Sequence, residues 1–313
     1  MARATAGAPR RIRRMPTLWT GSSHGVVWRL ELQRDALLPG RLVAGRIEVS
    51  SRGAFEARVL VVTLRATEHW QHRVTTTDSE GRTSSHVVTE RHDLLSEPVE
   101  VDAGVHLAAG EQRSWTFELP VPPLGPATLE ADVAGVDWMV EAKLERPGDF
   151  DSSIEAPVRV LQPVALLRSG AVPVGQFALF DSADVEADGA TGSLTLDPVP
   201  LCVGAPFTAQ LTLHPGGSRR LQEVRGEVRV KVEATVANGL DETITAWSGS
   251  LPIVELAGDR AISLSGTLSS QALPTIELPH GRASATFHVI LATAWAADPH
   301  LVRDVAIATT LEL

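Results

Sequence analysis

Apolar and polar residues alternate along most of the chain, with an apolar side chain at every second position. The clearest segments are 43–49, 60–66, 115–119 and 138–144. Successive side chains of a strand point to opposite faces, so a period of two is typical of strands with one buried face. Proline and glycine pairs interrupt these segments, and helical spacing is scarce. The sequence therefore predicts an all-β protein.

The second half of the chain repeats the pattern of the first. Three segments align in the same order, at offsets of 164, 168 and 149: 40–49 with 204–213, 60–66 with 228–234, and 138–142 with 287–291. The fall from 168 to 149 places 19 extra residues in the first half, after residue 66. The sequence thus predicts two similar units, of which the first carries an insertion.

Short strands, frequent turns and a repeat of this size favour two tandem antiparallel β-sandwich domains of the immunoglobulin-like kind. A length of 313 residues fits two such domains. The expected organisation is a basic flexible tail over 1–24, a first sandwich over 25–161, a linker over 162–176 and a second sandwich over 177–313.

The insertion, residues 69–95, reads as a long polar hairpin that turns at residues 78–81. A polar hairpin on a rigid scaffold is a common place for recognition residues, although many such hairpins are only connections. Six residues here are candidates for contact with a partner: Trp70, His72, Asp78, Glu80, Arg82 and His86.

Histidines are concentrated in the same hairpin, at positions 69, 72, 86 and 92. With the turn centred between Glu80 and Gly81, His69 faces His92 across the strands at about 5 Å, which makes this pair a candidate for metal ligands. His69 and His72 are three residues apart and point to opposite faces, and no cysteine or placed carboxylate completes a site. We therefore expect no metal and no other cofactor, and a metal-dependent enzyme is the alternative hypothesis.

The net charge of −10 argues against nucleic acid as a partner, because a phosphate backbone requires a concentrated basic face. Basic residues do cluster near the start of the chain. A basic tail of this kind can make weak contact with an anionic membrane, and the alternative is an ordinary solvated chain end. The residues concerned are Arg10, Arg11, Arg13 and Arg14.

The arginines are not followed by the apolar run of a signal peptide, and no apolar run of 18 residues occurs elsewhere. Cys202 is the only cysteine, which fits a reducing compartment and a buried thiol. Signatures of serine hydrolases, zinc proteases, P-loop proteins and dinucleotide-binding proteins are absent. We expect a cytoplasmic protein that is not an enzyme.

Four segments of the first half resemble the amino-terminal domain of arrestin-like proteins: LLPGRLVAGRIEVSS, VLVVTLRATEHW, LAAGEQRSWTFELPVPPLGPATLE and GVDWMVEAKLERPG. The matching elements are the Pro39-Gly40 turn, Trp70, Gly110 with the strand 117–120, and the strand 138–142. The resemblance covers about residues 25–160, and the second half matches loosely. It implies a scaffold or adaptor that binds protein partners. It extends to bacterial sporulation-control proteins, and so to a role in bacterial signalling or sporulation-type regulation, and to the arrestin-like subunit of retromer.

Overall fold

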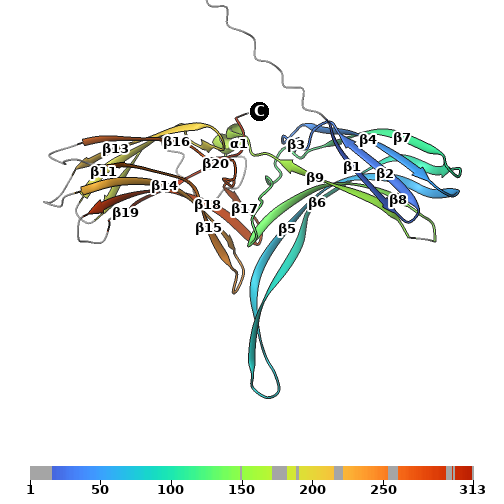
Figure 1. Ribbon diagram of the computed structural model, residues 1–313, viewed down its shortest axis with the longest axis horizontal. Coiled ribbons are helices and arrows are strands. Elements are labelled where there is room, and N and C mark those ends of the chain that lie inside the picture. Colours follow the sequence, from blue (N-terminus) through green and yellow to red (C-terminus); the bar gives the residue numbers. More distant parts are fainter. Residues whose placement is uncertain are drawn as a thin grey trace, which may run out of the picture.

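A computed structural model of the chain describes residues 16–148, 150–170, 182–187, 190–214, 221–252, 260–293, 298 and 300–311. Most of these residues lie in antiparallel strands, grouped into two halves on either side of a central junction (Figure 1). The predicted all-β fold is confirmed. None of the described helices is long and apolar enough to cross a membrane.

The N-terminal half contains two sheets. One has the order β1-β2-β4-β7, with β1 (Thr17–Ser23), β2 (Val26–Leu32), β4 (Leu42–Ser51) and β7 (Gln112–Pro120). The other has the order β3-β9-β8-β5-β6, with β3 (Ala36–Leu37), β9 (Ser152–Val160), β8 (Ala134–Glu145), β5 (Phe55–Thr77) and β6 (Thr83–Leu107). All pairs within them are antiparallel except β3 with β9.

The apolar phase of each strand forms the core between these two sheets. Residues 60, 62, 64 and 66 of β5 are fully buried, as the alternation predicts. Trp28 and Trp138 are among the largest fully buried side chains, and each indole N–H has an acceptor, Ser152 Oγ at 2.8 Å and the Pro126 carbonyl at 3.1 Å. A buried indole with its hydrogen bond satisfied contributes a large apolar area without a polar penalty.

The C-terminal half repeats much of this topology. One sheet has the order β10-β11-β13-β16, with β10 (Ser182–Ala187), β11 (Ala190–Asp197), β13 (Pro206–His214) and β16 (Arg260–Thr267). The other has the order β15-β14-β18-β17, with β15 (Asp241–Pro252), β14 (Leu221–Ala234), β18 (Gly281–Thr293) and β17 (Ile276–Glu277), and β19 (His300–Val305) also pairs with β18. A short parallel pair joins β12 (Leu201–Cys202) to β20 (Ile307–Ala308). Cys202 is buried, which raises the pKa of its thiol.

The backbone pairing corrects the alignment of the two halves in the long strands. The Gln71 N–H donates to the Val133 carbonyl and the Thr235 N–H donates to the His280 carbonyl, both at 2.8 Å and at the same end of the corresponding strand pairs. The offset is therefore 164 in β5 and 147 in β8, where alternation alone suggested 168 and 149. Both errors are even numbers of residues. Such a slip keeps every side chain on its face, so a period of two cannot detect it.

Two segments that the sequence placed in the tail and in the linker form regular secondary structure, the first a strand and the second a helix. Residues 17–23, placed in the tail by their position after the arginines, form β1, because their backbone pairs with β2 along the whole segment and Trp19 packs against the core. Helix α1 (Val164–Ser169) occupies the start of the predicted linker and buries Leu167. Residues 1–15, with the arginine cluster, and 171–176 of the linker lie outside the described residues.

A buried carboxylate joins the two halves. Glu68 of β5 has no exposed surface, and it accepts hydrogen bonds from the His280 main-chain N–H at 2.8 Å and from the His280 ring at 3.0 Å. The imidazole of His280 stacks on Trp70, with ring centroids 4.0 Å apart. A carboxylate removed from water is stable only when donors replace its hydration, so this contact fixes β5 against the C-terminal half.

Backbone hydrogen bonds extend the junction along β5. The Arg73 N–H donates to the Asn238 carbonyl at 2.9 Å, and the Leu240 N–H donates to the Gln71 carbonyl at 3.0 Å. Nearby, the Glu242 carboxylate accepts from the main-chain N–H groups of residues 132 and 133. The segment 238–240 thus adds to the outer edge of β5 in the way that a short extra strand would.

We expect Glu68→Ala to lower the free energy of unfolding by roughly 3 kcal/mol, because it leaves the His280 donors without their acceptor at a buried contact. The control is Glu56→Ala on the same strand, whose side chain is 76% exposed, with an expected change within about 0.5 kcal/mol. Urea unfolding of the full chain measures both. Equal losses for the two variants would contradict the role of Glu68.

Candidate functional site

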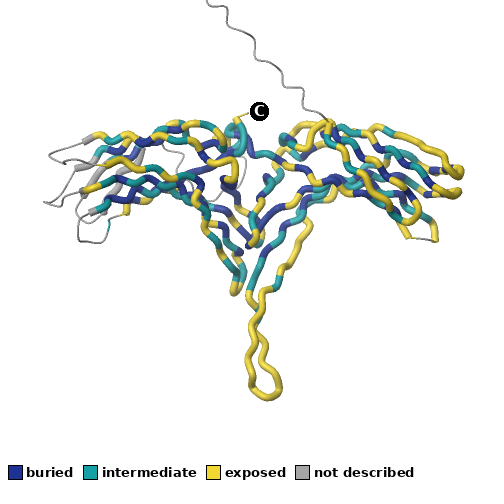
Figure 2. The backbone as a smooth tube through the Cα atoms, viewed as in Figure 1, coloured by how far each residue is buried: buried dark blue, intermediate teal, exposed yellow. Residues whose placement is uncertain are grey.

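Beyond the junction, β5 and β6 continue as a two-stranded ribbon that projects away from both halves (Figure 1). We call residues 73–88 the arm. Every residue from 75 to 87 is exposed, and Figure 2 shows the ribbon as an isolated exposed hairpin. β5 and β6 span 23 and 25 residues, against 14 and 12 for β14 and β15, so the arm accounts for the extra length predicted in the first half.

Asp78 organises the tip of the arm. Its N–H donates to the Arg82 carbonyl at 3.0 Å, and its carboxylate accepts from the N–H groups of Glu80 at 2.9 Å and Arg82 at 2.8 Å. Gly81 has a φ of 77°, a left-handed conformation that costs glycine little. The tip is therefore a defined three-residue turn closed by the pair of residues 78 and 82.

This turn is centred on Glu80, and that position decides the register of the whole hairpin. Glu68 pairs with His92, and His69 pairs with Arg91. The predicted centre between Glu80 and Gly81 is wrong by half a residue, so every predicted pair shifts by one. A shift of one residue moves a side chain to the opposite face. His69 and His92 therefore lie on opposite faces of the ribbon and are not a metal-binding pair.

Each of these two histidines has another role. The His69 ring nitrogen Nε2 lies 3.0 Å from the Ala131 carbonyl, and Nδ1 lies 3.3 Å from the Asp137 carboxylate. His92 lies against the edge of the His280 ring, with centroids 5.4 Å apart, and so borders the junction. In the part of the chain that the structure describes, no three His, Cys, Asp or Glu side chains gather closely enough to hold a metal ion.

The six candidate partner residues fall into two groups. Trp70 and His72 belong to the junction: Trp70 is only 5% exposed, and His72 bridges to Gly239 through its backbone and lies 3.5 Å from Glu90. Because Trp70 is covered by His280, it is not open to a partner. Asp78, Glu80, Arg82 and His86 all lie on the exposed arm. The sequence thus identified the arm. Two of the candidate partner residues, Trp70 and His72, lie at its base, however, where they pack in the junction.

Sequence reasoning missed the Glu68 and His280 pair, although one signal pointed to it. Glu68 falls on the buried phase of β5, two residues after Ala66 and two before Trp70. A charged residue at a buried strand position requires a partner from elsewhere in the fold. The partner, at position 280, could not be read from the sequence because nothing local marks it.

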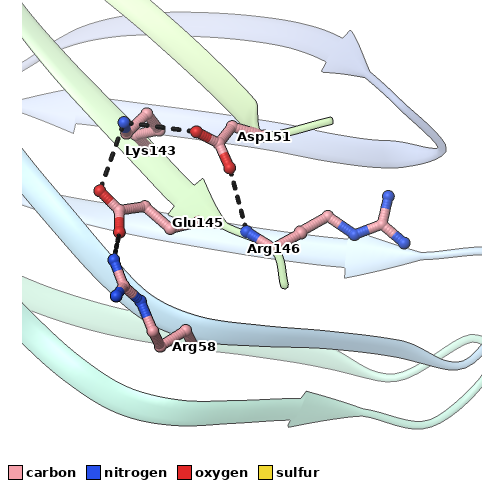
Figure 3. A network of polar contacts seen from close by, with 5 residues as sticks. All are labelled: Arg58, Lys143, Glu145, Arg146 and Asp151. Atoms are coloured by element: carbon pink, nitrogen blue, oxygen red, sulfur yellow. Dashed lines mark hydrogen bonds and ion pairs between the residues drawn. The ribbon is translucent and has the colours of Figure 1, made fainter. Parts of the chain in front are cut away.

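A second polar cluster lies at the far end of β8 and β9 (Figure 3). Glu145 contacts the Arg58 guanidinium and lies 3.3 Å from Lys143, and both contacts hold the pKa of Glu145 below its usual range. Asp151 accepts from the Arg146 N–H at 3.0 Å and lies 3.4 Å from Lys143. The opposite charges are paired with one another and are partly or fully exposed to solvent, so the cluster secures the β8–β9 connection and offers no reactive group.

The contact between His69 and Asp137 predicts a pH dependence of stability. The Asp137 carboxylate, 3.3 Å from His69 Nδ1, is the main reason that the pKa of His69 lies above its usual value, with burial opposing it, and His69 in turn lowers the pKa of Asp137. The raised histidine pKa contributes stability that is complete below about pH 6.5 and is lost as the pH rises through the folded value; the lowered aspartate pKa contributes stability that is lost in acid.

We therefore expect Asp137→Asn to lower the unfolding free energy at about pH 5.5, by less than about 1 kcal/mol because Asp137 is 54% exposed, and to have a smaller effect at about pH 8.5. Denaturant unfolding at the two pH values measures this, with Glu141→Gln on the same strand as the control. A loss that is the same at both pH values would show that the pair does not stabilise through charge.

In a comparison with known protein families, the N-terminal half of the chain, which carries the arm, gives a match. Residues 28–167 match the family described as arrestin (or S-antigen), N-terminal domain. No curated protein matches the chain. The matched segment runs from β2 into α1 and contains the whole of β5 and β6, and its strands follow the pattern that the sequence resemblance implies. Residues 28–167 thus belong to the arrestin N-terminal domain family, and this match supports an arrestin-like superfamily assignment.

Proposed function

We propose that the protein is a scaffold or adaptor that binds protein partners through the arm. The arrestin fold is of a generally non-enzymatic, scaffold kind, which supports a binding role. The observation that carries the proposal is the exposure of residues 75–87 on a ribbon that projects beyond both halves. A lone two-stranded ribbon buries no core and adds little to the stability of the fold, so recognition is the better explanation of its length.

The arm offers two kinds of contact. Its strand edges present backbone donors and acceptors to which a peptide strand can add. Its tip presents Glu80 and Arg82, an ion pair at 3.1 Å whose side chains are 66% and 80% exposed. Asp78 holds these two residues in place through its hydrogen bonds to their N–H groups. A partner would therefore meet a preorganised tip, which lowers the entropic cost of binding.

The remaining assignments are also proposals. We infer that residues 25–161 and 177–313 act as two domains, that the protein works in the cytoplasm, and that its role belongs to bacterial signalling or sporulation-type regulation. The last of these rests on the arrestin-like family alone. The basic residues Arg10, Arg11, Arg13 and Arg14, proposed to contact anionic membranes, lie outside the described residues.

Shortening the arm tests the proposal. Removing residues 74–77 and 83–86 takes four residues from each strand and keeps the tip 78–82. Because the number is even and equal on both strands, the tip then closes on the pair Arg73 and Val87 with its hydrogen-bond phase preserved. We expect partners captured by the full chain from native cells to be lost, while the melting temperature stays within about 3 °C, since no core is removed.

The control is the double variant Leu42→Ala and Leu124→Ala, which alters two exposed apolar side chains of the same half, 60% and 63% exposed, away from the arm. It should keep every partner. Retention of all partners by the shortened arm would count against the proposed function.

A further inference from the structure

β6 is an edge strand with two unlike parts. Among the residues that the structure describes, it pairs with β5 alone. Residues 93–102 carry the features by which proteins keep an edge from pairing: Asp93, Glu97, Pro98, Glu100 and Asp102. Residues 83–89, which comprise the β6 strand of the arm and the residue that follows it, have the sequence TSSHVVT and contain no proline, lysine or carboxylate. The outer edge of β6 therefore carries features that prevent strand pairing next to the sandwich, and it lacks them along the arm.

Hydrogen-bonded and non-hydrogen-bonded pairs alternate along β5 and β6, and this alternation shows which backbone groups of residues 83–89 point outward. Asp78 and Arg82 form a hydrogen-bonded pair, so the next such pairs along the ladder are 76 with 84 and 74 with 86. The intervening residues turn their N–H and carbonyl groups outward. Residues 71 and 73 confirm this phase, since their outward groups bond to residues 133, 238 and 240. On β6 the outward residues are therefore 83, 85, 87 and 89.

We propose that this edge pairs antiparallel with the same edge of a second copy of the chain, about a twofold axis at His86. Charge selects this register. It places Arg82 opposite Glu90 of the second copy, twice by symmetry, and both side chains are accessible, 80% and 50% exposed. An axis at residue 90 or 91 would instead set Glu90 against Glu90 or Arg91 against Arg91, which is unfavourable.

The same register satisfies the backbone. Residue 85 lies opposite residue 87 of the second copy, and residue 83 lies opposite residue 89, so all four outward residues fall in hydrogen-bonded pairs. Together they form about eight backbone hydrogen bonds. Val87, which is 48% exposed, covers Ser85 of the second copy, and Val88 lies opposite Ser84. The result is a four-stranded sheet made of two arms, an isologous contact of the kind that closed dimers use.

A charge exchange tests the pairing. In Arg82→Glu or Glu90→Arg alone, both ion pairs across the axis become pairs of like charge at once. We expect self-association of the full chain, followed by sedimentation velocity between roughly 1 and 200 µM, to weaken by about tenfold in each single variant. The double variant Arg82→Glu with Glu90→Arg restores opposite charges and should restore association to within about threefold of the original. Equal association of all four proteins would overturn the register.

A matched pair of prolines tests the edge. Thr75 and Ser85 lie opposite each other in a non-hydrogen-bonded pair, so proline at either removes an outward N–H and no bond between β5 and β6. Ser85→Pro alters the proposed interface and should abolish the dimer, whereas Thr75→Pro alters the other edge of the arm and should retain it. Loss in both variants or in neither would contradict the proposal.

A wild-type chain that stays monomeric over the whole concentration range would also overturn it, and would leave the β6 edge to a different protein. This inference goes beyond the capture of other proteins. If the chain does not dimerise, the proposed binding of other proteins through the arm still stands. If the chain dimerises but captures no other protein, the dimer stands and the proposed function fails.

Discussion

The burial of the Glu68 carboxylate is the constraint on which the arrangement of the two halves depends. A carboxylate without exposed surface must keep its donors, and both of the donors named here belong to His280 in the other half. Trp70, two residues further along β5, is covered by the same imidazole. β5 cannot slide along the C-terminal half without losing these contacts. Since the arm is the direct continuation of β5, its direction is set here as well (Figure 1).

Alternation of apolar residues predicted which faces of the strands are buried, and it did so well for 60–66 and for Trp138. It could not predict how corresponding strands align, because the pattern looks the same after a shift of two or four residues. The alignment of β5 with β14 was wrong by four residues for this reason. Only the hydrogen bonds of residues 71 and 235 reveal the correspondence. Position along a strand is set by pairs that are distant in the sequence, and a single sequence does not contain them.

The hairpin, in contrast, is sensitive to an error of a single residue in its predicted register. Its existence, its turn and its polar character were all evident from residues 69–95. Whether the turn has two or three residues depends on the hydrogen bonds of one carboxylate, that of Asp78. That detail placed His69 and His92 on opposite faces, so the two side chains cannot form the predicted metal-binding pair. In a strand, an odd error changes the chemistry of a site completely, while an even one leaves it intact.

The two edges of the arm differ in one more respect. On the β5 side, the outward groups of residues 71 and 73 are already taken by the segment 238–240 and by Val133. On the β6 side, the ladder is open. A ribbon with two open edges would accept strands from both sides and grow without limit into a fibril. By covering the base of one edge with its own C-terminal half, the protein leaves a shorter open edge on β5, at residues 75 and 77, than on β6, where residues 83, 85, 87 and 89 are open.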